Sequence, residues 1–91
     1  MTFPDYINNM KEKDKIRLQK IGANLLRLRT ERNMTQEALS YQCDIDRAKI
    51  SKIESGQANL MITTLLDLAE GLNVSSAELL DLNSKQRKLS K

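Results

Sequence analysis

The sequence predicts an all-α fold of five short helices, and three observations carry this prediction. Between about residues 15 and 82, apolar residues recur at helical rather than strand spacing. Residues that favour helix N-termini precede the apolar runs, and residues that tolerate a left-handed backbone follow them. No alternation of apolar and polar residues is long enough to predict a sheet.

The first predicted helix extends from about Lys15 to Arg32 and ends at Asn33. One face carries apolar residues at i, i+3, i+7 and i+10, which is the spacing of a buried helical stripe. These residues are Leu18, Ile21, Leu25 and Leu28. We therefore expect this helix to pack along its length against the rest of the domain.

A short second helix is expected after Thr35, a residue type that caps helix N-termini well. Glu37 lies in its first turn, where a carboxylate suits the helix dipole. The helix should end near Cys43, because Asp44 tolerates the left-handed conformation of a tight turn. Ile45 is expected to fill that turn.

The third predicted helix is capped by Asp46, points Ile50 and Ile53 inward, and closes at Gly56 as a C′ residue. Its basic residues, Arg47, Lys49 and Lys52, are then left on other sides of the helix. A brief turn thus joins two short helices, the second with a basic outer face. This shape fits a major groove about 12 Å wide.

Two more helices complete the prediction. A fourth, from about Met61 to Leu72, can end at a left-handed Asn73. A fifth begins with the capping box formed by Ser75 and Glu78. The inward residues of the fourth helix are Ile62, Leu65, Leu68, Ala69 and Leu72, and the fifth contains Leu79 and Leu80.

The chain has room for one domain, which we place at residues 15–82. Residues 1–14 are expected to form a flexible N-terminal arm or a frayed helix extension, because they carry no sustained apolar period. Residues 83–91 form a basic C-terminal tail, which is either a solvated end or a phosphate contact. The basic residues of this tail are Lys85, Arg87, Lys88 and Lys91.

The composition excludes most enzyme chemistry. The 91 residues contain no histidine and one cysteine, which rules out a Ser-His-Asp triad, a Cys-His pair and a multi-thiolate zinc site. Gly22, Gly56 and Gly71 lie too far apart for a phosphate-binding loop. We therefore expect a protein that is not an enzyme and that needs no cofactor or metal. The net charge of +3 favours a polyanionic partner.

The single cysteine and the apolar pattern bear on the compartment. Cys43 cannot form an intrachain disulfide, which favours a reducing cytoplasm, and its position favours a buried structural thiol over a redox sensor. No apolar stretch reaches about 18 residues, and the first fifteen residues lack the apolar centre of a signal peptide. We expect a soluble cytoplasmic protein.

Several segments together resemble the Xre or Cro/repressor-like family of helix-turn-helix regulators, over about Leu18 to Leu82. The matching segments are Arg29, Thr35-Gln36-Glu37, Ile50-Ser51-x-Ile53-Glu54-x-Gly56, Thr64-Leu65-Leu66-x-Leu68-Ala69 and Leu72-x-Val74-Ser75. The resemblance implies a five-helix, lambda-repressor-like DNA-binding domain. The chain departs from the family pattern at Leu60 and Met61, where relatives commonly have a proline and a serine cap.

The resemblance also implies roles for individual residues. Base-reading positions fall on Arg47, Ala48, Lys52 and Gln36, of which Gln36 contacts a base or the backbone in relatives. Backbone or auxiliary contacts fall on Thr35, Lys49, Ser51, Ser55 and Asn59. Arg29 and Glu54 occupy positions that commonly form a salt bridge between the first helix and the end of the third. The plainer interpretation of the basic residues is a solvated helix face.

These observations lead to a sequence-specific, double-stranded DNA-binding transcriptional regulator, as a dimeric repressor that reads a palindromic operator. Leu79, Leu80 and Leu82 either form the dimer surface or complete the core. Two alternatives remain open. One is an antitoxin or a restriction-modification controller with a protein partner, and the other is a protein-interaction module that does not bind DNA.

Overall fold

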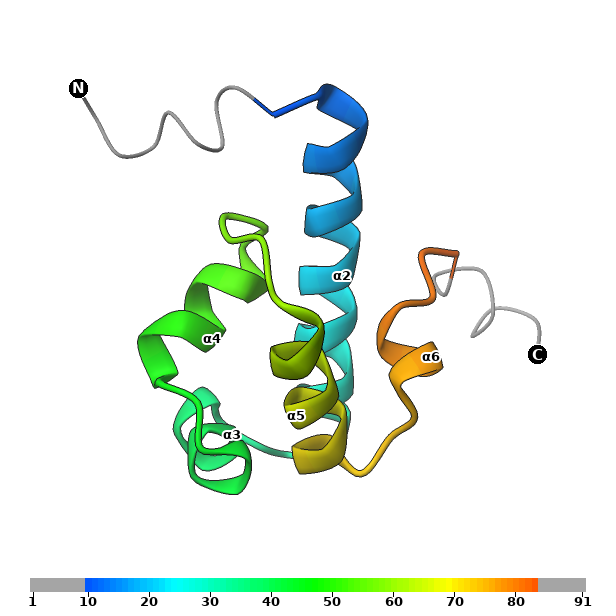
Figure 1. Ribbon diagram of the computed structural model, residues 1–91. Coiled ribbons are helices and arrows are strands. Elements are labelled where there is room, and N and C mark those ends of the chain that lie inside the picture. Colours follow the sequence, from blue (N-terminus) through cyan, green and yellow to red (C-terminus); the bar gives the residue numbers. More distant parts are fainter. Residues whose placement is uncertain (1–9, 84–91) are drawn as a thin grey trace.

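The computed structural model describes residues 10–83, which form five α-helices and no strand (Figure 1). The helices are α2 (Glu12–Glu31), α3 (Gln36–Cys43), α4 (Arg47–Glu54), α5 (Ile62–Leu72) and α6 (Ser76–Leu79). This is the all-helical, five-helix architecture that the sequence predicts. None of these helices combines the length and the apolar composition needed to cross a membrane.

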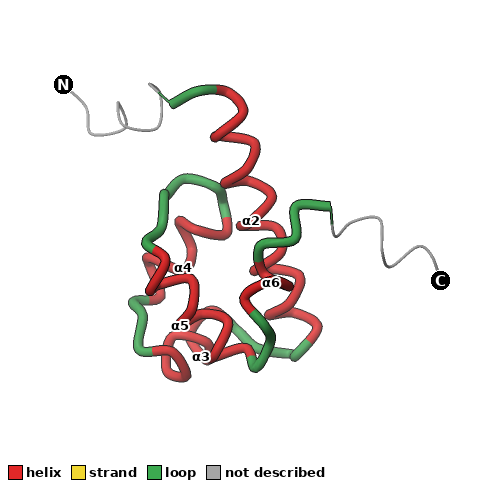
Figure 2. The backbone as a smooth tube through the Cα atoms, turned by 45° about the vertical axis from the view of Figure 1, so that its right-hand side comes forward, coloured by secondary structure: helices red, strands yellow, loops and turns green. Residues whose placement is uncertain are grey.

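The long helix α2 lies between the shorter helices, with α3 and α4 on one side of it and α6 on the other (Figure 1). Helix α4 packs against α2 and α3, while α5 packs against α3 and α6. Helix α6, the last helix, packs against α2, the first. The view in Figure 2, turned from that of Figure 1, shows α3, α4 and α5 grouped together beside α2.

A single apolar cluster lies where these helices meet, and every one of the five contributes to it. Its fully buried members include Leu25 and Leu28 from α2, Leu39 from α3, and Leu79 from α6. Ile50, Ile53, Leu68 and Leu72 are buried to the same degree. Because Leu79 is 0% exposed, it belongs to the core rather than to a surface available to a partner.

The ends of the helices follow the residue types that predict them. The Thr35 hydroxyl accepts a hydrogen bond from the Ala38 N–H at 2.9 Å, and the Ser75 hydroxyl accepts one from the Glu78 N–H at 3.2 Å. Left-handed residues end three helices or their turns, as expected for short polar side chains. These residues are Asn33, Asp44 and Asn73, and Gly56 adopts a φ of +77°.

The start of α2 differs from the prediction, and two later helices begin without a side-chain cap. Helix α2 begins at Glu12, three residues before the expected Lys15, because Glu12 and Asp14 place carboxylates in its first turn and Asp14 pairs with Arg17 at 3.0 Å. Asp46 is the N-cap residue of α4, but its side chain makes no capping hydrogen bond. Met61 precedes α5 and offers no side-chain cap either. Ile62, which was expected to point inward, is instead 65% exposed in the first turn of α5, so that expectation was wrong.

Both expected extensions fall largely outside the described residues. Residues 1–9 of the predicted N-terminal arm and residues 84–91 of the predicted basic tail lie outside them. The tail cations Lys85, Arg87, Lys88 and Lys91 are among the residues that are not described.

Candidate nucleic-acid interface

Helix α4 divides its side chains between the core and the surface. Ile50 and Ile53 are at most 1% exposed and fix the helix on the apolar cluster. Arg47, Lys49 and Lys52 are exposed. Ala48 is also exposed, whereas Ser51 is partly buried. The three predicted base-reading positions of α4, Arg47, Ala48 and Lys52, therefore all lie on the surface. The exposed cations make this face of α4 basic.

A three-residue turn sets the direction of α4 relative to α3. Asp44 takes the left-handed conformation at φ 58°, and its N–H donates to the Ser40 carbonyl at 2.9 Å. Ile45 packs against the core from within the turn. Since α3 and α4 also contact each other directly, the two helices form a packed pair joined by a short turn (Figure 2).

The polar residues predicted beside α4 lie at the start of α3, at the end of α4 and in the loop that follows α4. Thr35, Ser55 and Asn59 are exposed. The Thr35 hydroxyl already caps α3, and the Ser55 hydroxyl donates to the Lys52 carbonyl at 3.0 Å. Asn59 lies in the loop between α4 and α5. Two of these three residues thus have local structural bonds in addition to any contact with a ligand.

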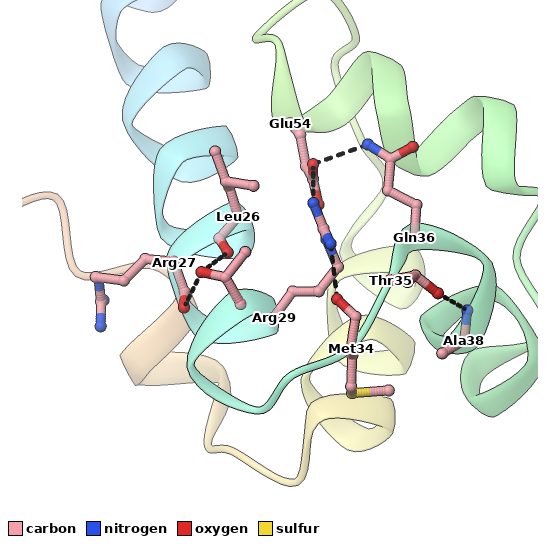
Figure 3. Close-up of polar contacts among 9 residues, drawn as sticks. Leu26, Arg27, Arg29, Met34, Thr35, Gln36, Ala38 and Glu54 are labelled. Atoms are coloured by element: carbon pink, nitrogen blue, oxygen red, sulfur yellow. Dashed lines mark hydrogen bonds and ion pairs between the residues drawn. The ribbon is translucent and has the colours of Figure 1, made fainter.

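The expected ion pair between Arg29 and Glu54 is present and nearly buried. Arg29 Nε lies 2.6 Å from Glu54 Oε2, and its Nη2 donates to Oε1 at 3.0 Å, while the side chains are 11% and 7% exposed (Figure 3). Arg29 Nη1 donates to the Met34 carbonyl at 2.7 Å. The hydrogen bond to Glu54 raises the pKa of Arg29, against the opposing effect of its burial. This fork ties α2 to the end of α4 and to the loop before α3.

Gln36 joins this ion pair, which sequence reasoning did not predict. Its Nε2 donates to Glu54 Oε1 at 2.9 Å, and the side chain is partly buried at the first position of α3 (Figure 3). The two residues are 18 positions apart, and no local spacing pattern links the start of one helix to the end of the next. Gln36 is therefore part of a network of side chains as well as a candidate DNA contact.

Two other kinds of site, a metal centre and a reactive thiol, depend on the acidic residues and on Cys43. Residues 10–83 contain no group of three or more His, Cys, Asp or Glu side chains placed to hold a metal ion. Cys43 is partly buried and its thiol donates to the Leu39 carbonyl at 3.0 Å. Burial raises the pKa of this thiol, which disfavours the reactive thiolate.

Comparison with known proteins gives consistent matches. The model of a helix-turn-helix domain family matches residues 22–85. An uncharacterised HTH-type transcriptional regulator of Sinorhizobium fredii is 37% identical over 59 residues, which cover 65% of this chain and 77% of that protein. The control protein C.BamHI of Bacillus amyloliquefaciens is 37% identical over 60 residues, covering 62% and 74% respectively.

Solved structures give the same match in three dimensions. The restriction-modification controller protein C.AhdI of Aeromonas hydrophila superposes with a TM-score of 0.67 at 35% identity, covering 68% of this chain and 94% of that one. The controller C.Esp1396I, crystallised as a tetramer on its natural 35-base-pair operator, has a TM-score of 0.67 at 37% identity, covering 75% and 90%. The fold and its α3–α4 unit are thus shared with these proteins.

Proposed function

We propose, from the fact that this chain belongs to the helix-turn-helix domain family, that it places α4 in the major groove of a specific operator. The chain is a DNA-binding transcriptional regulator and not an enzyme. The observation that carries the proposal is the exposed basic face of α4, which stands on the buried Ile50 and Ile53. The proposal assigns DNA binding to the predicted domain, residues 15–82, extended at its start to Glu12, where α2 begins.

On this proposal the residues divide their work between bases and backbone. Arg47 reads a base, because its planar fork can bind guanine O6 and N7 together. Lys52 and Ala48 contact neighbouring base edges, the latter through its methyl group. Thr35, Lys49, Ser51, Ser55 and Asn59 anchor phosphates and set the register without reading sequence. A regulator of this kind must reach the DNA that it controls. We therefore propose that it acts in the cytoplasm.

A narrower function, control of a restriction-modification operon, is supported by the identity of the relatives. Two control proteins match at 34% and 37% identity, and this chain covers 82% and 74% of their lengths. The controllers of known structure have little besides the domain that they share with this chain. The proposal predicts that the operator lies upstream of methyltransferase or endonuclease genes. An operator located elsewhere would return the chain to the general class of regulators.

A homodimer is the expected binding form, and α5 offers the surface for it. Met61 and Ile62 are each 65% exposed, and Leu66 is 48% exposed one turn further along. Leu66 also lines a shallow hollow between α5 and α6. A second copy related by a two-fold axis can place its own Ile62 and Leu66 against this surface. The residues that line the hollow are Leu66, Ala69, Glu70, Asn73, Val74 and Ser76.

The test is to select sequences from random duplex DNA with the full chain and then to measure affinity against salt concentration. We expect a palindromic consensus with half-sites about 34 Å apart and a steep loss of affinity with salt. Absence of any enriched sequence, together with binding that is insensitive to salt, would leave the protein-interaction module as the better interpretation.

A further inference from the structure

The Glu54 carboxylate accepts hydrogen bonds from donors on two other elements. Arg29 gives it two hydrogen bonds, Nε to Oε2 at 2.6 Å and Nη2 to Oε1 at 3.0 Å. Gln36 gives it a third, Nε2 to Oε1 at 2.9 Å. Figure 3 shows the Gln36 amide turned toward Glu54 from the start of α3. The last residue of α4 therefore touches both α2 and the first residue of α3.

The chemistry of Glu54 fixes which end of the Gln36 amide faces it. An ionised carboxylate only accepts hydrogen bonds, so it selects the NH₂ end and excludes the carbonyl end. The carbonyl oxygen of Gln36 is thereby directed away from Glu54 (Figure 3). It has no hydrogen-bond partner among residues 10–83, and the side chain is partly exposed. An amide that normally flips freely is here held in one orientation.

Arg29 makes this arrangement compatible with DNA. A lone carboxylate beside the DNA-binding surface would repel phosphate, but the nearly buried guanidinium compensates the charge of Glu54. The pair therefore contributes no net charge to the surface, while Glu54 keeps its capacity to accept. What remains at the surface is the neutral amide of Gln36.

We infer that Glu54 is a positioning residue that turns Gln36 into an acceptor for an exocyclic base amine, adenine N6 or cytosine N4. Phosphate oxygens have no hydrogen to donate, so the outward carbonyl oxygen of Gln36 can only meet a donor on a base, while its second N–H can donate to a base or to a phosphate. In the major groove the donors are the amines of adenine and cytosine. With adenine, the second N–H of Gln36 can also reach N7. The inference rests on the proposed DNA-binding function and assigns the chemistry of one contact within it.

The first test compares Glu54→Gln with Glu31→Gln. Each variant removes one negative charge, and Glu31 pairs with Arg27 and Arg32 rather than with the network around Gln36. Charge alone predicts that both variants bind DNA more tightly. In Glu54→Gln, however, the single carbonyl oxygen serves Arg29 and the NH₂ group faces Gln36, so we expect the Gln36 amide to flip.

We expect Glu54→Gln to lose discrimination by about two- to tenfold at one base pair of each half-site, the range of one neutral hydrogen bond. Glu31→Gln should keep that discrimination. Thermal unfolding of each variant, measured in the same buffer, shows that the comparison concerns folded protein. The inference is overturned if Glu54→Gln keeps the preference of the unmodified chain at every position.

A second test leaves the protein unchanged and alters the DNA. In the selected operator, each adenine is replaced in turn by purine deoxynucleoside, which lacks the N6 amine, and each cytosine by its analogue without the N4 amine. We expect one such replacement per half-site to weaken binding by the unmodified chain and to have no effect on Gln36→Met. If every replacement that weakens the unmodified chain also weakens Gln36→Met equally, Gln36 reads no amine. Failure of the unmodified chain to select any sequence would instead overturn the proposed function.

Discussion

Arg29 and Glu54 form the nearly buried pair that ties α2 to α4, and their removal should be strongly non-additive. Taking away one partner of a fully buried pair costs about 3–5 kcal/mol, against about 0–1 kcal/mol for an exposed pair. At 11% and 7% exposure, this pair lies near the buried limit. We expect each of Arg29→Ala and Glu54→Ala to lower the free energy of unfolding by about 3 kcal/mol.

A double-mutant cycle in urea separates the pair from its surroundings. Because the second substitution removes the charge that the first leaves uncompensated, Arg29→Ala/Glu54→Ala should cost clearly less than the sum of the two single variants. Gln36→Ala, measured alongside, shows how much of the cost of Glu54→Ala comes from the bond to Gln36. Additive free energies would contradict the assigned pairing.

Arg47 should affect base preference, whereas its neighbour Lys49 should affect overall affinity. Both side chains are exposed cations on α4, so either alanine variant removes the same charge. Arg47→Ala loses a fork that can bind guanine at two points, worth about 1–3 kcal/mol of discrimination. Binding titrations with single base-pair variants of the operator should show one relaxed position per half-site for Arg47→Ala and none for Lys49→Ala. An unchanged preference profile for Arg47→Ala would remove it as the reading residue.

At the scale of the elements, the close approach of α2 and α4 depends on Gly22. A Cβ atom added there would lie 2.6 Å from the Glu54 carbonyl oxygen and would also meet that of Ile53. Both atoms are backbone at the end of α4, so they cannot move as a flexible side chain would. Gly22 therefore sets the distance between α2 and the helix that carries the basic face.

We expect Gly22→Ala to lower the free energy of unfolding by about 1–3 kcal/mol, the usual range for overpacking. This outcome is opposite to helix propensity, which favours alanine over glycine by about 1 kcal/mol within a helix. Thermal or urea unfolding measures the sign. The exposed Ala23→Gly at the next position of α2 is the control for propensity, since it removes a methyl group that lies outside the core. A stabilised Gly22→Ala protein would show that α4 is free to move outward.

The elements also show which features a sequence can predict. Local signals gave reliable boundaries where a cap or a left-handed residue is encoded within a few positions, as at Thr35, Asp44 and Ser75. They failed where the chain offers no such residue or where acidic residues extend a helix, as at the start of α2. The pairing of Arg29 with Glu54 came from a family resemblance rather than from spacing.

Neither a local spacing pattern nor the family resemblance predicted the hydrogen bond between Gln36 and Glu54. It joins the first residue of one helix to the last residue of the next, so it depends on how the turn at Asp44 aims α4. Spacing along the chain does not encode that direction. Such a contact can be identified only once the relative positions of the helices are known. The orientation of the Gln36 side chain could therefore not be predicted from the sequence.

At the scale of the whole molecule, α6 closes the domain by returning to α2. The Asn24 side chain, 5% exposed, donates from Nδ2 to the carbonyls of Leu79 at 2.9 Å and Asp81 at 2.8 Å. Three leucines were considered for the dimer surface. Leu79 lies in the core, Leu82 is partly buried, and Leu80 is exposed. The larger exposed apolar area lies on α5.

The predicted dimer surface can be tested with a charge placed on α5. Leu66→Glu puts a carboxylate where the second copy would bury Leu66, and burial of an unpaired charge is costly. We expect the dimer dissociation constant, measured by analytical ultracentrifugation, to rise at least about tenfold, which corresponds to 1.4 kcal/mol. The matched control is Leu26→Glu on α2, since Leu26 is 43% exposed and Leu66 is 48% exposed.

The consequence for DNA follows from the symmetry of the dimer. If two copies of α4 bind successive faces of the duplex, Leu66→Glu should lose affinity for the full palindrome while its weaker affinity for an isolated half-site stays close to that of the unmodified chain. Leu26→Glu should keep both affinities. Equal loss for both variants on the palindrome would indicate a general effect of added negative charge, and the second copy would then have to bind through a surface other than α5.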